Sequence, residues 1–242
     1  MIRSTRRGAI ALVTIDRPDR RNAINAEMCE QLTASVQEAL ATDARALVLT
    51  GAGGHFCAGA DLSGVEGDHF RAVLAVALRT LCNAPIATIA AVEGVALGAG
   101  TQLAVACDLR VATADARFGI PAAKLGLMVD HWTVRRVTRM AGEATARAML
   151  LATEELTGDA AVRIGFAQRA GHLADAMAWA DAIAELAPLT IAGHKLALER
   201  AVAELDADPD VDAAVRRAWG SADLQEGMAA FKDRRRPDFQ GR

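Results

Sequence analysis

Strand-length apolar segments alternate with helical patterns in this 242-residue chain up to about Asp130. These segments are rich in Val, Ile and Leu and cover residues 10–16, 45–50, 86–92 and 108–112. Strands that alternate with helices are typical of a parallel sheet with right-handed connections. We therefore expect an α/β fold with a core of ββα-type units.

Helical periodicity fills the intervals between these segments and most of the chain after them. Residues 25–40 begin with Asn25, whose side chain can cap the first amides, and a second helix is expected over 70–81. Farther along, the pattern predicts helices at roughly 132–140, 143–151, 157–164, 174–187, 189–205 and 209–230. No linker divides the chain, so we expect one continuous unit with a core over residues 1–185 and a helical region over 186–242.

Composition excludes several classes of protein. An apolar content of 52% excludes a disordered chain, and a net charge of −3 provides no general field for nucleic acid or an anionic membrane. The four cysteines have neither close pairing nor metal-ligand spacing, which favours buried free thiols and no metal site. The apolar run at 9–15 is too short to span a membrane. We expect a cytoplasmic protein without a transmembrane segment and without a nucleic-acid partner.

Two glycine-bearing turns follow the second and third expected strands. The first contains Phe56-Cys57-Ala58-Gly59-Ala60-Asp61, and the second contains Gly98-Ala99-Gly100 followed by a helical run. Glycine lets the backbone approach a ligand closely because no Cβ atom obstructs it. Free amides at the start of a helix favour negative charge. The two turns together indicate a site for an oxyanion.

Five segments resemble the enoyl-CoA hydratase/isomerase, or crotonase, superfamily over nearly the whole chain. They read RPDRRNAIN, GAGGHFCAGADL, APIATIAAVEGVALGAGTQLAVACDLRVA, ARFGIPAAKLGL and EGMAAFKDRRRPDF. The resemblance implies repeated ββα units with a C-terminal helical region, here 186–242, that serves trimerisation and covers CoA. It also implies a homo-trimer or a hexamer, an acyl-CoA thioester as substrate or ligand, and no further cofactor.

The resemblance also implies roles for particular residues. The amides of Ala58 and Ala99 match those that polarise the thioester carbonyl. Ala99 replaces the usual glycine, but its backbone donor survives if its φ is negative. Positions that match the CoA-binding loops are the stretch from Arg21 to Ala23, together with Ala58, Ala60, Asp61 and Leu62. In the tail, Phe231, Lys232 and Arg235 match a region that often reaches the nucleotide end of CoA, and the alternative for them is a solvated basic tail.

The sequence departs from the hydratases of this family at both glutamate positions. Gln102 and Ala122 stand where those enzymes have glutamates. Hydration needs groups that move protons, and neither side chain exchanges a proton at neutral pH. Each acid–base group contributes about 10²–10⁴-fold to rate, so hydratase activity, which belongs to the lyase class, is expected to be weak or absent.

Asp130 is the leading alternative for chemistry. An aspartate at this position is catalytic in some isomerases and dehalogenases of the family, so it could act as a base or a nucleophile. The simpler interpretation, which we favour, is that Asp130 caps the helix that starts near Trp132. His131 and Trp132 are candidates for the acyl pocket, although a lone histidine more often satisfies a local hydrogen bond.

Gln102, Ala122 and the Asp130–Trp132 segment are together similar to an actinobacterial crotonase subgroup that binds long acyl-CoA without hydrating it. Three hypotheses follow. The first is an acyl-CoA-binding protein of fatty-acid or lipid metabolism that works with fatty-acid synthesis enzymes. The second is an active crotonase, either a residual hydratase or an enzyme using Asp130, and the third is an oligomeric interaction protein with a vestigial pocket.

Overall fold

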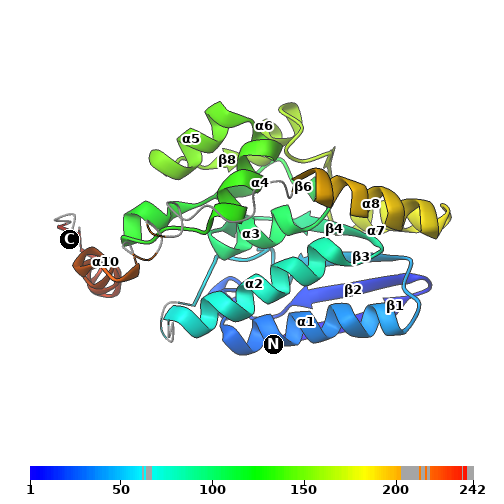
Figure 1. Ribbon diagram of the computed structural model, residues 1–242, viewed down its shortest axis with the longest axis horizontal. Helices are drawn as coiled ribbons and strands as arrows, with labels where there is room; N and C mark the ends of the chain where they lie inside the picture. Colours follow the sequence, from blue (N-terminus) through cyan, green and yellow to red (C-terminus); the bar gives the residue numbers. More distant parts are fainter. Residues whose placement is uncertain are drawn as a thin grey trace.

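A computed structural model describes residues 1–61, 63, 67–202, 213, 216, 219–235 and 237–238. Two sheets form its centre (Figure 1). The larger has the order β1 (Ile2–Arg7), β2 (Ile10–Ile15), β3 (Ala46–Gly51), β4 (Ala87–Val92), β6 (Leu109–Ala112) and β9 (Arg169–Ala170). The smaller consists of β5 (Val95–Leu97), β7 (Arg117–Gly119) and β8 (Leu156–Thr157). The α/β fold expected from the sequence is confirmed.

The four expected strands correspond to β2, β3, β4 and β6, within one residue at each end. Their side chains are almost all buried, which explains the near-continuous apolar runs. The expectation of a parallel arrangement is correct for these strands and wrong at the edge, where β1 pairs antiparallel with β2. Strand β1 reads IRSTRR and is mostly exposed, so no apolar periodicity marks it in the sequence.

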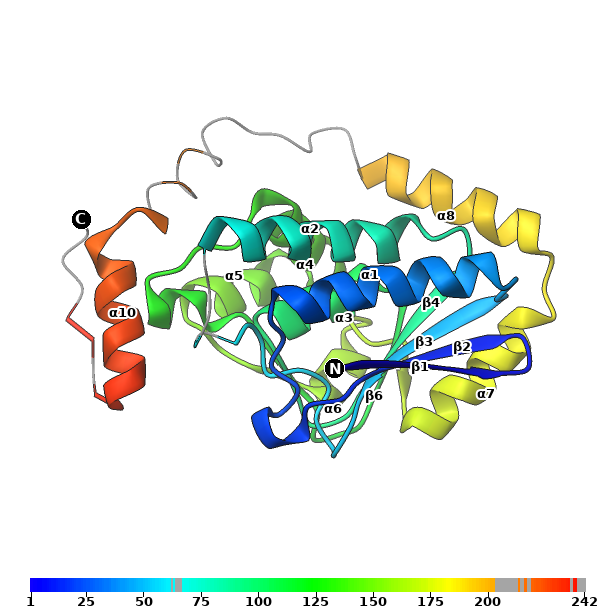
Figure 2. The same cartoon turned by 90° about the horizontal axis from the view of Figure 1, so that it is seen from below.

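Helices cover both faces of the larger sheet (Figure 2). Helices α1 (Ala26–Ala41), α2 (Gly67–Asn83) and α3 (Ala99–Ala106) enclose the main core on one face, and α7 (Leu173–Ala184) packs on the other. Asn25 caps α1 as expected, because its side chain accepts a hydrogen bond from the Met28 amide at 3.0 Å. A sheet that is covered on both sides leaves its functional groups at the strand ends.

The ββα units place two of these strand ends side by side. Strand β4 continues into β5 and then α3, while the turn after β3 forms an isolated bridge between Cys57 and Ala96 of β5. Strand β5 thus belongs to the smaller sheet, and the turn after β3 is attached to it by this one bridge. The first glycine-bearing turn is therefore held against the start of α3.

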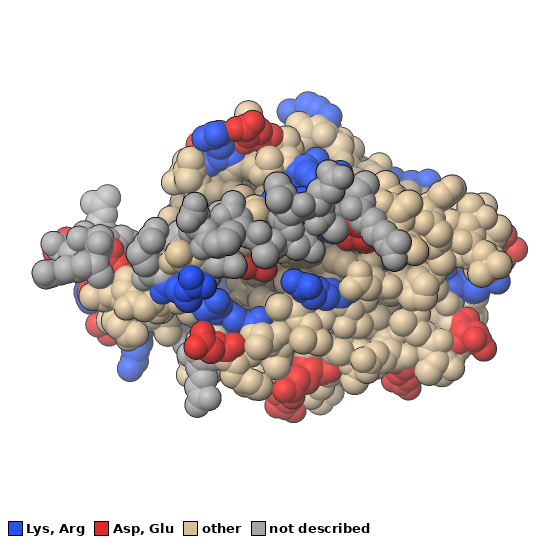
Figure 3. All heavy atoms as spheres, in the orientation of Figure 1, with Lys and Arg blue, Asp and Glu red and all other residues tan. Residues whose placement is uncertain are grey.

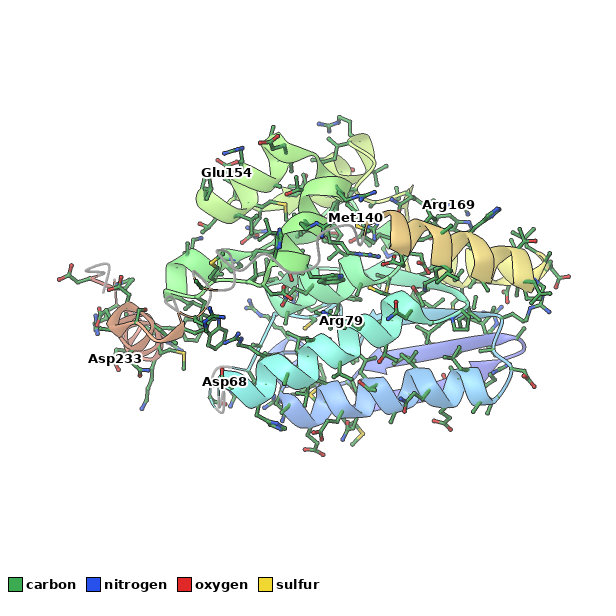
Figure 4. The ribbon with its side chains drawn as sticks, in the orientation of Figure 1. Asp68, Arg79, Met140, Glu154, Arg169 and Asp233 are labelled. Carbon is green, nitrogen blue, oxygen red and sulfur yellow. The ribbon has the colours of Figure 1, made fainter. Side chains whose placement is uncertain are left out.

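Charged side chains of both signs lie on the face shown in Figure 3. Several Lys and Arg side chains lie over its middle, where Figure 4 labels Arg79 of α2, and Asp and Glu lie along the margin formed by α1 and beside basic residues elsewhere on the face. Exposed acidic residues of α1 include Glu27, Glu30 and Glu38. The face has a locally positive region although the net charge of the chain is −3.

The later part of the chain is helical, as expected. Its further helices are η3 (Pro121–Leu125), α4 (His131–Ala141), α5 (Glu143–Leu151), α6 (Gly158–Arg163), α8 (Pro188–Val202) and α10 (Ala222–Asp233). One more short helix, η1 (Pro18–Arg20), lies near the start of the chain. The helix expected over 209–230 is described continuously only from residue 219, so its first part lies outside the described residues. Helix α8 packs on α2 and β4, and α10 packs on η3 at the opposite end of the molecule (Figures 1 and 2).

All four cysteines are free and buried, as expected: Cys29, Cys57, Cys82 and Cys107. Burial raises the pKa of each thiol to about 12, so they remain neutral and act as small apolar side chains. No helix in the described part of the chain is both long and apolar enough to cross a membrane.

Candidate active site

The two glycine-bearing turns lie directly against each other. The amide of Leu97 donates to the Cys57 carbonyl at 2.9 Å, and the Cys57 amide donates to Val95 at the same distance. A Cβ atom on Gly100 would overlap the Cys57 carbonyl oxygen, so a larger residue at this position would force the turns apart. The backbone approach of the two turns is thus fixed by glycine and by paired amides.

The hydrogen bonds of the first turn correct one sequence assignment. The Ala58 amide donates to the Arg21 carbonyl at 2.9 Å, so its hydrogen is already used and Ala58 is wrong as an oxyanion donor. Ala60 forms a parallel bridge with Ile24 through the backbone groups of its two neighbours, and its own amide faces the opposite way. Among the residues that the structure describes, the Ala60 amide has no acceptor. Ala60 is therefore the donor that the first turn offers.

The second donor is the Ala99 amide. Ala99 is the first residue of α3 and follows Gly98, whose φ of 52° reverses the chain. Ala99 is not among the residues with positive φ, so the replacement of glycine causes no backbone strain. No acceptor for its amide lies in the described part of the chain, as is usual for the first turn of a helix. A Cβ atom on Gly59, the residue before Ala60, would lie 3.9 Å from the Ala99 nitrogen, so the two turns meet next to these donors.

Two buried arginines occupy the other end of α3. Arg110 donates to the carbonyls of Ala104 and Cys107 at 3.2 and 3.0 Å, and Arg136 donates to Val105 at 2.6 Å. Cations at a helix C-terminus stabilise the negative end of the helix dipole. The positive end of α3 remains directed at the Ala99 amide, where an oxyanion would bind.

A side-chain network joins α3 to the start of α4. The Gln102 amide nitrogen donates to the Thr133 hydroxyl at 2.7 Å, and the Thr133 hydroxyl donates to the Asp130 carboxylate. Asp130 also accepts from the Thr133 amide at 3.1 Å and is the N-cap of α4. The capping role favoured by the sequence is confirmed, and Asp130 itself is exposed.

The remaining candidates near α4 are largely apolar. Ala122 lies in η3 and packs against the main core, so it supplies no polar group. Trp132 also packs on this core, and the Arg136 guanidinium lies 5.4 Å from its ring centroid. His131 Nδ1 is buried and has no hydrogen-bond partner within the described residues.

Hydrogen bonds connect the two loops that are expected to hold CoA. Arg17 donates to the Asp61 carboxylate at 2.6 Å and to the Ala23 carbonyl at 3.3 Å. The Ser63 hydroxyl donates to Asp61 at 2.6 Å, and this bond, together with Arg17, lowers the pKa of Asp61 to about 2. Arg21 has a φ of 48° and is exposed, so its side chain is free to contact a ligand beside these loops.

Of the tail candidates, Phe231 and Lys232 lie in the last turn of α10, and Arg235 follows this helix. Phe231 is 63% exposed and Lys232 is also exposed, while Arg235 pairs with Glu226 at 2.6 Å. Leu62, another CoA candidate, lies outside the described residues.

Sequence reasoning missed Thr133, and it included Asn22 in the CoA-loop stretch from Arg21 to Ala23 without identifying a role for its side chain. Thr133 links Gln102 to Asp130, and Asn22 donates to the carbonyls of Ala52 and His55 at 2.7 and 2.5 Å. Asn22 is fully buried with a φ of 61°, and it ties the CoA-loop candidates to the first glycine-rich turn. The only local signal was an asparagine next to a turn, which is too common to distinguish this role.

The chain is similar to known proteins in both sequence and fold. The family model described as Enoyl-CoA hydratase/isomerase matches residues 5–242. The chain is 45% identical, over the full length of both, to a protein of Mycobacterium tuberculosis named probable enoyl-CoA hydratase echA6. The structure of carnitinyl-CoA hydratase from Mycobacterium avium is similar with a TM-score of 0.84 and 31% identity, covering 100% of this chain and 98% of that one. Methylmalonyl-CoA decarboxylase has the same fold, with a TM-score of 0.91, 23% identity and the same two coverages.

The fold and the sequence similarity define a protein of the crotonase superfamily. The chain belongs to the enoyl-CoA hydratase/isomerase family.

Proposed function

We propose that this protein binds acyl-CoA thioesters in fatty-acid or lipid metabolism, with an intact oxyanion hole and without hydratase chemistry. The observation that carries the proposal is the contrast between the two parts of the site. The Ala60 and Ala99 amides are free to donate hydrogen bonds to a thioester oxygen, whereas Gln102 and Ala122 supply no acid or base. The names of the relatives, enoyl-CoA and carnitinyl-CoA hydratases, support a CoA thioester as the ligand.

The position of Asp130 supports the same proposal. Its carboxylate accepts two hydrogen bonds from Thr133 and caps α4, which is a structural task. The second candidate function, an active hydratase/isomerase or another enolate-stabilising enzyme that uses Asp130, is favoured by the names of the relatives and by the exposure of this carboxylate.

We also propose that residues 186–242 form an assembly and CoA-covering region of a homo-trimer or hexamer. The exposed leucines of α8 and the exposed Phe231 of α10 support this assignment. Fatty-acid synthesis enzymes are the proposed protein partners, since a carrier must receive and deliver its acyl thioester.

The first prediction concerns binding without turnover. Butanoyl-, dodecanoyl- or hexadecanoyl-CoA at about a hundredfold excess over its Kd should stabilise the protein by about 2.7 kcal/mol. The corresponding 2-enoyl-CoAs should not be consumed. Thermal unfolding and the absorbance of the enoyl thioester measure the two effects.

Ala99→Pro tests whether the α3 amide takes part. Proline suits the first position of a helix but removes this donor, so the stabilisation by acyl-CoA should fall. Glu143→Pro is the matched control, because Glu143 starts α5 after Gly142, a glycine with positive φ like Gly98. Turnover of a 2-enoyl-CoA at ordinary hydratase rates would contradict the proposal. If Asp130→Asn lost this turnover but still bound acyl-CoA, the second function would be established instead.

A further inference from the structure

The hydrogen bonds of Thr133 determine which end of the Gln102 carboxamide faces the site. A threonine hydroxyl has one proton to donate, and an ionised carboxylate can only accept. Because the Thr133 proton is given to Asp130, the hydroxyl oxygen can only accept from Gln102. The group of Gln102 that meets Thr133 must therefore be its NH₂ group, and the carbonyl oxygen Oε1 points elsewhere.

The free oxygen of Gln102 remains open to a ligand. Gln102 is 8% exposed, and no donor to its Oε1 lies among the residues that the structure describes. Oε1 is also not among the fully buried polar atoms that lack a partner. The network thus presents a hydrogen-bond acceptor at an accessible position.

This acceptor lies next to the oxyanion donors. Gln102 follows Ala99 by three positions in α3, so the two residues share one face of the helix with Cβ atoms about 5–6 Å apart. A thioester oxygen at the Ala99 amide would place the next two carbons of the acyl chain within reach of Gln102. The site then combines donors for the thioester with an acceptor for the chain beside it.

We propose that Asp130 and Thr133 are positioning residues that make this pocket select acyl chains with a hydroxyl donor near the thioester, such as 3-hydroxyacyl-CoA, over 3-oxoacyl-CoA of equal length. A hydroxyl can donate to Gln102 Oε1, whereas a ketone oxygen would face another acceptor and leave both without a hydrogen bond. This inference rests on the proposed acyl-CoA binding and deepens it. The opposite orientation of the carboxamide would select the ketone.

Isothermal titration calorimetry with dodecanoyl-, 3-hydroxydodecanoyl- and 3-oxododecanoyl-CoA tests the inference. The wild-type protein should bind the hydroxy form about tenfold more tightly than the oxo form, as one hydrogen bond allows. Thr133→Val, which keeps the shape and removes the hydroxyl, should reduce this ratio to within about twofold. Thr133→Ser, which retains the hydroxyl, should keep the roughly tenfold preference for the hydroxy form.

Asp130→Ala provides a second variant if Thr133→Val does not fold. Without the carboxylate, the Thr133 hydroxyl can either accept from the Gln102 NH₂ group or donate to Oε1, so both orientations of the carboxamide become possible and the preference should weaken. Equal binding of the hydroxy and oxo forms, a preference for the oxo form, or an unchanged ratio in a folded Thr133→Val would overturn the inference while leaving the proposed function intact. Failure of all three thioesters to bind would overturn both.

Discussion

At the scale of single residues, glycine decides how closely the two turns of the site can approach. Gly100 lies in α3, where a Cβ atom would overlap the Cys57 carbonyl oxygen, whereas Gly193 lies in α8 with nothing within 4 Å of its virtual Cβ atom. The sequence indicated the first of these contacts, because glycine clusters after strands are typical of close backbone approach. It did not identify Ala60 as the donor, since that depends on which amide donates to the Arg21 carbonyl.

These two helical glycines allow a matched prediction. Gly100→Ala should destabilise the protein by about 1–3 kcal/mol or more, because the turn carrying Cys57 must move. Gly193→Ala should be neutral or stabilise it by up to about 1 kcal/mol, because alanine favours the helix and meets no neighbour. Urea unfolding measures both changes, and equal effects would show that the contact with Cys57 is not restrictive.

At the scale of elements, α3 is held by charges at its C-terminal end. Arg136 donates to Val105 of α3 and pairs with both carboxylate oxygens of Glu199 at 2.9 and 2.7 Å, which ties α8 to the same place. Lys195 of α8 pairs with Asp108 at 2.8 Å and donates to the carbonyls of Leu81 and Ile86. The periodicity of the sequence predicted α8 as a helix but gave no indication of these partners, which are distant along the chain.

Glu199→Gln should loosen α8 and destabilise the protein by about 1–3 kcal/mol. It removes the charge opposite Arg136, which is 4% exposed and cannot recover its hydration. Glu143→Gln is the control, because its pair with Arg147 is 71% and 67% exposed and should contribute at most about 0.5 kcal/mol. Hydrogen exchange of α8 amides checks the location of the effect. Unchanged protection of α8 would contradict it.

At the scale of the whole molecule, α8 leaves apolar surface uncovered. Leu189, Leu196 and Leu198 are 86%, 53% and 67% exposed, although the same helix is anchored on its inner side by ion pairs. Leu189 and Leu196 are seven residues apart and therefore share one face of the helix, and exposed leucines grouped in this way are typical of an interface rather than of a solvated surface. A second copy of the chain is the occupant that the proposed trimer or hexamer requires.

Leu189→Glu should therefore weaken the assembly, with a shift from trimer or hexamer toward monomer in light scattering coupled to gel filtration. Leu189 is so exposed in the single chain that the substitution should leave the fold intact. Leu151→Glu at the end of α5, with 73% exposure, is the matched control. A monomeric wild-type protein, or an equal effect of the two substitutions, would contradict this assignment.

The sequence by itself determined the α/β fold, four of the strands, most of the helices and the buried cysteines. These features depend on local periodicity and on residue identity, which are visible along the chain. Only the tertiary structure decided that Ala60 rather than Ala58 offers its amide, that β1 lies antiparallel at the edge, and that Thr133 orients Gln102 through Asp130. Each of these depends on which hydrogen-bond partner folding brings close, and spacing along the chain does not specify that partner.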